Sequence, residues 1–380
     1  MPAHDAVKLQ HIFWLTILVH AAFASMRVAV SLFALHLGAS ALTVGIIMAL
    51  IAFLPMLMSV HAGRAIDRVG PRRPMVLGAA LIAAGLSLAA AVPRLETLFF
   101  VTPVTGVGFL LYHIAAHQAV GMLGEERTRT RNFSMLALAF STSSFIGPML
   151  AGFLIDLVGY LATFAASTII GACAWAAALR LRGGDARSAA PASGRKPRAF
   201  DLLRTRELRT VLGVSGLLSI CWDLFTFAIP IYGVRIGLSA SEIGIILGAF
   251  GIAIFAVRLL IPLVAHRMQE WTLLIATMVV TAAAYVAIPL VTSTGLLMLL
   301  AFVAGFGLGA AQPMIMTLVY RAAPKGRAGE AVGIRTLFLN VSQTAVPLAS
   351  GAFGAALGMT PAFWLTAVLL AAASWYVRRR

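Results

Sequence analysis

The chain has 380 residues, of which 61% are hydrophobic and only 11% are charged, and its mean hydropathy is +0.95. This composition excludes a soluble globular protein, because a soluble surface needs about 25–35% charged residues. The lipid bilayer is therefore the expected surrounding of most of the chain.

Apolar stretches of about 20 residues recur along the whole chain, and each is long enough to cross about 30 Å of hydrocarbon as a helix. The first half holds the predicted spans 11–36, 42–62, 74–92, 97–121, 132–155 and 158–180. The second half holds 209–234, 242–265, 271–291, 295–320, 328–355 and 358–377. The predicted fold class is an all-α integral membrane protein with twelve transmembrane helices.

Residues 182–208 separate the two sets of spans and are rich in Arg, Gly, Ser, Ala and Pro, a composition typical of a flexible linker. We therefore predict an N-terminal six-helix bundle at 1–181, a cytoplasmic linker at 182–208 and a C-terminal six-helix bundle at 209–380.

One block of sequence occurs twice, 199 residues apart, and relates the two halves. The pattern G-x-S-A-x-x-x-G-I-I begins at Gly38 and again at Gly237. Further identities keep the same offset without a gap: Arg68 with Arg267, Gly106 with Gly305, Gly108 with Gly307, Pro148 with Pro347, Gly152 with Gly351, and Gly159 with Gly358. The two predicted bundles are therefore pseudo-symmetric.

Basic residues are divided unequally between the two sets of loops. Of the 29 Lys and Arg, two (Arg94 and Arg235) fall in the loops on one side and three lie inside predicted helices, which leaves 24 on the other side. Basic loops stay in the cytoplasm, so both termini and the linker are expected there, in a multi-pass protein of the cytoplasmic (inner) membrane. This placement explains the net charge of +16 without a nucleic-acid partner.

A charged motif, G-x-x-x-D-R-x-G-x-R-R, lies between the second and third spans and comprises Gly63, Asp67, Arg68, Gly70, Arg72 and Arg73. Gly63 and Gly70 are expected to let the chain turn tightly between helix ends, and the arginines to hold the turn in the cytoplasm. Asp67 is an anion placed to meet a positive helix N-terminus or a basic side chain. Together with twelve spans, a basic linker and the repeat, this motif resembles the signature loop of the major facilitator superfamily of secondary transporters.

The resemblance covers essentially the whole chain and implies two six-helix bundles that rock about a site at the bilayer midplane, which gives alternating access. It also implies that the Asp67 loop is a gate that latches onto helix 11 of the second half, here near residues 326–330. At the equivalent positions of the second half, Pro262 and His266 replace Gly63 and Asp67, so the gate is expected on one side only.

The fifth span resembles a G-P-x-x-G-G element that the family associates with exporters exchanging substrate for protons. Proline bends a helix and close-packed glycine lets another backbone approach. The residues of this helix-bend element and its repeat are Gly147, Pro148, Gly152, Pro347 and Gly351. The sequence departs from the family pattern at Ser134, Ser143 and Ala151, and Thr102 replaces an arginine that the family often has in helix 4.

Charged residues inside predicted helices indicate function, because an ionised side chain at mid-bilayer costs about 2.5–3.5 kcal/mol on insertion scales. They are Arg27, Asp223, Arg258 and Arg335. Arg27 and Asp223 lie on polar faces of the first and seventh spans, which line the central cavity in the family, and they are expected to pair or to share a substrate. Asp223 is the candidate proton carrier, with Arg27 opposing its protonation, and a structural ion pair between the two is the alternative.

Other polar and aromatic side chains are expected to line the same cavity: Thr16, His20, Tyr112, His113, His117, Ser219, Trp222, Thr226 and Gln312. His113 and His117 are spaced as i and i+4, but no carboxylate or cysteine nearby completes a metal site, so substrate contact or packing is expected instead. Three arginines against one aspartate favour a small organic anion over a cation. For Arg258 and Arg335, snorkelling, bonding to carbonyls and contact with substrate all stay open.

The sequence indicates no enzyme and no cofactor. It lacks a phosphate-binding G-x-x-x-x-G-K-[ST] pattern, and Gly106 and Gly108 lie in an apolar helix rather than after a strand. The predicted function is proton-coupled export of a small organic molecule by alternating access. Proton-coupled uptake of a small organic anion is the alternative, and a non-transporting sensor or scaffold is a remote one. The expected partners are the substrate, the proton and the bilayer, and the chain is expected to be a monomer.

Overall fold

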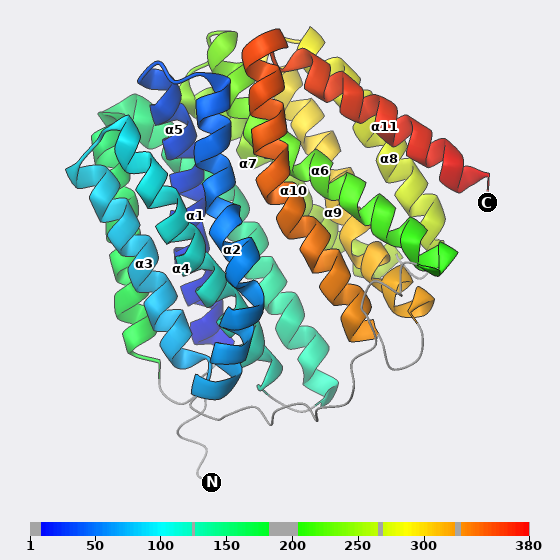
Figure 1. Ribbon diagram of the computed structural model, residues 1–380, viewed down its shortest axis with the longest axis horizontal. Coiled ribbons are helices and arrows are strands. Elements are labelled where there is room, and N and C mark those ends of the chain that lie inside the picture. The colour runs from blue at the N-terminus through cyan, green and yellow to red at the C-terminus, as the bar shows by residue number, and fades with distance from the viewer. Residues whose placement is uncertain (1–8, 124–125, 182–203, 265–268, 324–327, 380) are drawn as a thin grey trace. The chain divides into compact units, whose positions relative to one another are not determined.

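The computed structural model describes residues 9–123, 126–181, 204–264, 269–323 and 328–379, and these residues form helices and no strand. The helices, labelled in Figure 1, are α1 Leu9–His36, α2 Ala41–Val69, α3 Arg72–Ala91, α4 Leu95–Gly121, α5 Glu126–Leu179, α6 Arg206–Arg235, α7 Ala240–Val264, α8 Glu270–Ala287, α9 Thr294–Ala322, α10 Ala328–Leu357 and α11 Thr360–Arg378. A short 3₁₀ helix, Ile288–Leu290, extends α8.

α5 is two helices in direct succession. Gly159, with φ 81° and ψ 173°, interrupts the helical geometry, so α5 corresponds to the predicted spans 132–155 and 158–180. With α5 counted as two, the described residues hold the twelve helices that the sequence predicts. Ten described stretches are long and apolar enough to cross a membrane; one of them, Arg131–Leu179, covers both parts of α5, and α10 is not among the ten. The chain is a multi-pass membrane protein.

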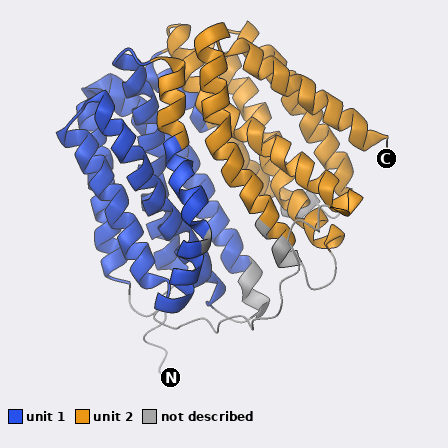
Figure 2. Cartoon of the chain, in the orientation of Figure 1, with its two compact units in different colours: residues 1–39, 50–192, 239–248 blue, residues 40–49, 193–238, 249–380 orange. Residues whose placement is uncertain are grey.

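The helices cluster into two compact units, coloured separately in Figure 2. Unit 1 comprises residues 1–39, 50–192 and 239–248, and unit 2 comprises residues 40–49, 193–238 and 249–380. Unit 1 thus contains the first residues of α7, whose remainder belongs to unit 2, and unit 2 contains the first residues of α2, whose remainder belongs to unit 1. Residues 182–203 of the predicted linker lie outside the described residues, and the predicted domain boundaries stay predictions.

The repeated sequence block builds the same helix stop and helix start in each half. Gly38 and Gly237 follow α1 and α6 with φ values of 79° and 80°, a left-handed conformation that glycine adopts without steric cost. Ser40 and Ser239 directly precede α2 and α7, and each Oγ accepts the backbone N–H three residues ahead at 3.2 Å. In the second copy Glu242 also accepts the Ser239 N–H at 2.8 Å, which completes a capping box.

The second glycine of the repeated block, Gly45 in one copy and Gly244 in the other, lies where two helix backbones approach closely. In unit 2, a Cβ added at Gly45 would lie 3.2 Å from Cα of Gly351; in unit 1, a Cβ added at Gly244 would lie 3.1 Å from Cα of Gly152. The carbonyls that border these two contacts belong to Pro347 and Pro148. Small residues here let helix backbones pack closely, as they do in membrane helix pairs generally.

Within unit 1, α1 packs along α5, and α3 packs along α4 and α5; within unit 2, α6 packs against α9 and α10, and α8 against α9 and α11. Gly147 of α5 sits directly on α1, where an added Cβ would lie 2.6 Å from Cβ of Ala24 and 2.9 Å from the Ala21 carbonyl. The helix-bend element therefore places α1 and α5 in backbone contact.

The predicted loop around Gly63 and Asp67 is mostly helix, which corrects the expectation for Gly63. α2 continues to Val69 and α3 begins at Arg72, so the turn is short. Gly70 has φ 79°, as a tight turn requires, whereas Gly63 lies inside α2 with no atom within 4 Å of an added Cβ. The helix continues because this segment still buries an apolar side chain, Ile66, which is 1% exposed.

Candidate functional site

Asp223 occupies the middle of α6 in unit 2 and is 7% exposed. The Ser342 hydroxyl on α10 donates a hydrogen bond of 2.6 Å to Oδ2 of this carboxylate. The other acidic residues in the described ranges lie at or near helix ends: Asp67, Glu96, Glu126, Asp156, Glu207, Glu242, Glu270 and Glu330. Among the described residues, Asp223 is thus the carboxylate set deepest in an apolar helix.

Arg335 of α10 is the second buried charge of unit 2, with 8% of its surface exposed. Its Nε donates to Oγ of Ser215 on α6 at 3.0 Å, and its Nη2 donates to Oε1 of Gln312 on α9. In the described part of the chain, Arg335 forms no ion pair. The guanidinium is therefore held by neutral groups from two neighbouring helices.

These contacts form two polar rungs between α6 and α10. Ser215 and Asp223 are eight residues apart on α6, and their partners Arg335 and Ser342 are seven apart on α10. At a rise of 1.5 Å per residue, the cationic and anionic rungs are about 11 Å apart along the helices. Two opposite charges thus share one helix pair in unit 2 without direct contact.

Other predicted cavity residues of α6 are engaged within their own helix. The Ser219 hydroxyl donates to the Ser215 carbonyl at 2.7 Å, and the Thr226 hydroxyl donates to the Trp222 carbonyl at 3.1 Å. The Trp222 ring meets the Phe250 ring edge-on, with centroids 5.2 Å apart.

In unit 1 the structure gathers the three predicted histidines around Phe140 of α5. The ring centroids of His20, His113 and His117 lie 5.2, 5.1 and 5.8 Å from the Phe140 centroid. The ring centroids of His113 and His117 are 4.3 Å apart, and Nδ1 of His20 is 2.7 Å from Oγ of Ser143. Nδ1 of His117 lies 2.9 Å from the His113 carbonyl, which can only accept, so that nitrogen carries the hydrogen.

Thr16 and Tyr112 are also brought together, but inside packed protein. Both are fully buried, and their hydroxyl groups are hydrogen-bonded at 2.8 Å. These two side chains satisfy each other and border no open space within unit 1.

The remaining charges of the membrane interior are half-buried. Arg27 lies in α1 of unit 1, and Arg258 lies in the part of α7 that belongs to unit 2. The predicted pairing of Arg27 with Asp223 stays a prediction.

Asp67 of the predicted gate lies in the last turn of α2, where it accepts a hydrogen bond of 3.0 Å from Nε2 of Gln118 on α4. Oε1 of Gln118 is buried without a partner among the described residues. Of the expected partner segment 326–330, residues 326–327 lie outside the described residues, as does His266.

The three arginines of the gate motif lie at the facing ends of α2 and α3. Arg68 and Arg73 are exposed, whereas Arg72 is half-buried and its Nη2 donates to the Leu179 carbonyl at 3.4 Å. Arg72 thereby ties the start of α3 to the end of α5.

The sequence reasoning missed Asp156, which follows the helix-bend element on α5. Its two carboxylate oxygens accept the backbone N–H groups of Ala240 and Ser241, at 3.2 and 2.7 Å, in the first turn of α7. A carboxylate at a helix N-terminus satisfies free N–H groups and complements the helix dipole. The repeat held a signal for this contact, because the two halves differ here: the residue 199 positions after Asp156 is Ala355, which has no carboxylate.

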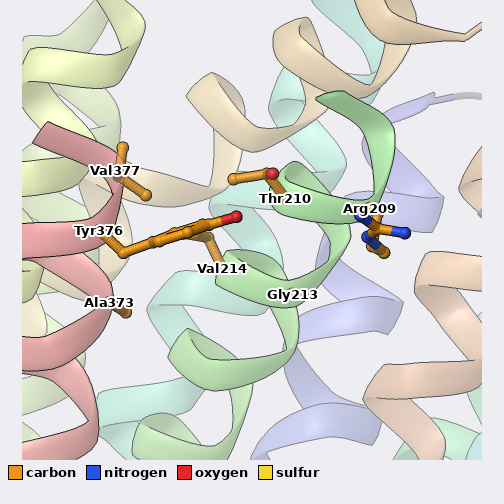
Figure 3. A pocket seen from close by; sticks show the side chains of 7 residues that line it. All are labelled: Arg209, Thr210, Gly213, Val214, Ala373, Tyr376 and Val377. Carbon is orange, nitrogen blue, oxygen red and sulfur yellow. The ribbon is translucent and has the colours of Figure 1, made fainter. Parts of the chain in front are cut away.

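Two pockets of unit 2 are lined by the start of α6 and the end of α11, and none of the predicted cavity residues lines either of them. The one in Figure 3 has a volume of about 220 Å³, and the Tyr376 ring extends across it from α11 toward α6. The other, about 500 Å³, is lined by Arg206, Glu207, Thr210, Trp271 and Val377. In the described part of the chain, no three His, Cys, Asp or Glu side chains are grouped to hold a metal ion.

Solved transporter structures share this fold. A POT family transporter in complex with a thioalcohol-conjugated peptide is 17% identical with a TM-score of 0.77, over 97% of this chain and 95% of that chain. The nucleoside transporter NupG is 14% identical with a TM-score of 0.81, over 98% and 99%. The human organic anion transporter MFSD10 is 16% identical with a TM-score of 0.71, over 99% and 100%. These identities establish similarity of fold alone.

A search of curated proteins finds no relative that matches the sequence. The sequence model described as Major Facilitator Superfamily matches residues 12–330 and 212–380, which together cover almost the whole chain. The chain therefore belongs to the Major Facilitator Superfamily of secondary transporters.

Proposed function

We propose that the protein exports a small organic molecule across the cytoplasmic membrane in exchange for protons, and that Asp223 carries the proton. The observation that carries this proposal is the burial of the Asp223 carboxylate in the middle of α6, where the Ser342 hydroxyl donates a hydrogen bond to it.

The partner of Asp223 suits a group that gains and loses a proton. A serine hydroxyl donates to an ionised carboxylate and can also accept from a protonated one, so Ser342 satisfies both states. Burial favours the neutral acid, whereas a cation beside the carboxylate, the role predicted for Arg27, would favour the ionised form. A change in the surroundings of Asp223 during alternating access would therefore drive uptake or release of the proton.

The test compares two variants of this rung in proteoliposomes. Asp223→Asn keeps the size and hydrogen bonding but cannot ionise, so transport driven by a pH gradient should be lost while exchange of substrate continues. Ser342→Ala removes only the hydroxyl and should slow transport without uncoupling it. Persistence of pH-gradient-driven transport in Asp223→Asn would refute the proton role.

Export is proposed because α5 carries Gly147, Pro148 and Gly152 of the exporter-like element, and these residues form close backbone contacts. The second candidate is proton-coupled uptake of a small organic anion, which the buried cation Arg335 favours. Flux in right-side-out and inside-out vesicles under the same inward proton gradient separates the two directions. Both termini are proposed to be cytoplasmic, from the distribution of arginine.

A further inference from the structure

Arg335 carries a buried positive charge that its neighbours do not neutralise. Its two described partners, Ser215 and Gln312, are neutral, and no described carboxylate forms an ion pair with it. A buried ion that lacks a counter-charge is costly, because hydrogen bonds to neutral groups replace only part of its hydration. A fold that keeps such a residue in a membrane helix normally uses it.

The hydrogen bonds of Arg335 leave one edge of the guanidinium available. A guanidinium has five N–H donors. The Nε hydrogen is used by Ser215 and one Nη2 hydrogen by Gln312, so three N–H groups on Nη1 and Nη2 remain. Nη1 has no hydrogen-bond partner among the described residues, and 8% of the Arg335 surface stays exposed.

The two neutral contacts also fix the orientation of that edge. Ser215 on α6 and Gln312 on α9 hold the guanidinium from two different helices, so its plane is set before any ligand arrives. A planar fork with two outward N–H groups matches the two oxygens of a carboxylate, or two oxygens of a sulfonate, in bidentate geometry.

We propose that Arg335, positioned by Ser215 and Gln312, is the anion-binding subsite of unit 2 and that the transported molecule is a small organic anion. The inference rests on the proposed transport function and names its substrate class. The Asp223 rung lies about 11 Å further along the same helices, so an anion at Arg335 and a proton at Asp223 would occupy separate places.

The test is binding to the purified full-length protein at constant ionic strength, measured by thermal stabilisation. The probes are acids matched with their neutral amides: benzoate with benzamide, hexanoate with hexanamide, and benzenesulfonate with benzenesulfonamide. We expect at least one anion to stabilise the wild-type protein while its amide does not. Absence of stabilisation by every anion, or equal stabilisation by anions and amides, would overturn the proposal.

Variants assign the binding to Arg335. Arg335→Gln should weaken binding of the stabilising anion about 10- to 100-fold, because hydrogen bonds to a charged group are lost. Arg335→Lys keeps the charge without the fork, so it should keep the preference for anions at reduced affinity. If Arg335→Gln does not fold, the affinity and anion preference of Arg335→Lys test the assignment instead. Arg378→Gln removes an exposed arginine of the same unit and should bind as the wild type does.

Unchanged affinity and preference in a folded Arg335→Gln protein would overturn the assignment, and so would loss of the anion preference in Arg335→Lys. Binding in detergent needs no transport, so failure here leaves the flux test of Asp223 intact. Anion binding without any flux in proteoliposomes would instead refute the transport function alone.

Discussion

At the scale of the residue, Asp156 makes a contact that the second half of the chain does not repeat. Its carboxylate accepts two N–H groups in the first turn of α7, within unit 1. We predict that Asp156→Ala lowers the free energy of unfolding by about 0.5–1 kcal/mol, because the cap is lost. That figure is in the lower part of the range for N-terminal caps, since Asp156 is exposed and solvent screens its charge. Thermal unfolding in detergent measures the change.

Two further variants separate the cap from general effects of charge at Asp156. Asp156→Asn keeps one oxygen acceptor and should lose less stability than Asp156→Ala. Glu96→Gln removes a carboxylate that complements the dipole of α4 in the same unit but accepts no hydrogen bond from a described N–H group, so it should lose less stability than Asp156→Ala. Equal stability of Asp156→Ala and the wild type would show that the contact does not hold α7.

At the scale of the element, one pair of glycines in each unit sets how closely two helices approach: Gly152 with Gly244 in unit 1, and Gly45 with Gly351 in unit 2. A Cβ on Gly152 would collide with the Ala240 carbonyl and lie 3.0 Å from Cα of Gly244, all within unit 1. We therefore predict that Gly152→Ala destabilises the protein by about 1–3 kcal/mol through overpacking. Gly351→Ala, whose Cβ would lie 2.7 Å from the Ala41 carbonyl in unit 2, should have the same sign and a similar size.

The matched control for Gly152 is a helical glycine in open space. Gly213 lies inside α6 with no atom within 4 Å of an added Cβ. Gly213→Ala should raise stability by about 0.5–1 kcal/mol, because alanine favours the helix more than glycine does. If Gly152→Ala and Gly213→Ala shifted the melting temperature in the same direction, close packing at Gly152 would not be the cause.

At the scale of the whole molecule, the repeat predicted much of the backbone. Gly106 and Gly305, paired by the offset of 199, each lie against the carbonyl of an equivalent residue, Ile51 in unit 1 and Phe250 in unit 2. The repeat predicted two related halves, and the structure shows that its paired glycines play equal parts: Gly159 and Gly358 have φ values of 81° and 79°. The resemblance to the family came from the same repeat together with the motif at Asp67, and the match of the family sequence model confirms it.

The side-chain partners were not predictable in the same way. A soluble helix shows its buried face by apolar periodicity, but in a bilayer the lipid-facing side is equally apolar, so the rotation of each helix is not encoded by hydrophobicity. The partnership of Asp223 with Ser342, and of Arg335 with Gln312, depends on that rotation. The hydrogen bond between the buried hydroxyl groups of Thr16 and Tyr112 depends on it as well.

The Asp67 gate is a prediction about the whole molecule, because it concerns the balance between conformations open to either side. Asp67→Asn removes a charge that is proposed to hold the cytoplasmic side closed against a helix N-terminus. Such a charge contributes about 0.3–1 kcal/mol, so the population open to the cytoplasm should rise about two- to fivefold. Labelling of His117→Cys by a membrane-impermeant thiol reagent from the cytoplasmic side should become faster by that factor.

Gln118→Leu is the control that separates the charge of Asp67 from its local hydrogen bond. The variant removes the donor that lies 3.0 Å from Asp67 within unit 1 but leaves the carboxylate ionised. If the charge is the latch, Gln118→Leu should label as the wild type does while Asp67→Asn labels faster. The reporter protein replaces the native Cys173 and Cys221 by serine, so that His117→Cys is the only thiol. Identical labelling rates in Asp67→Asn and the wild type would refute the latch, whereas equally fast labelling in both variants would assign the effect to the bond between α2 and α4.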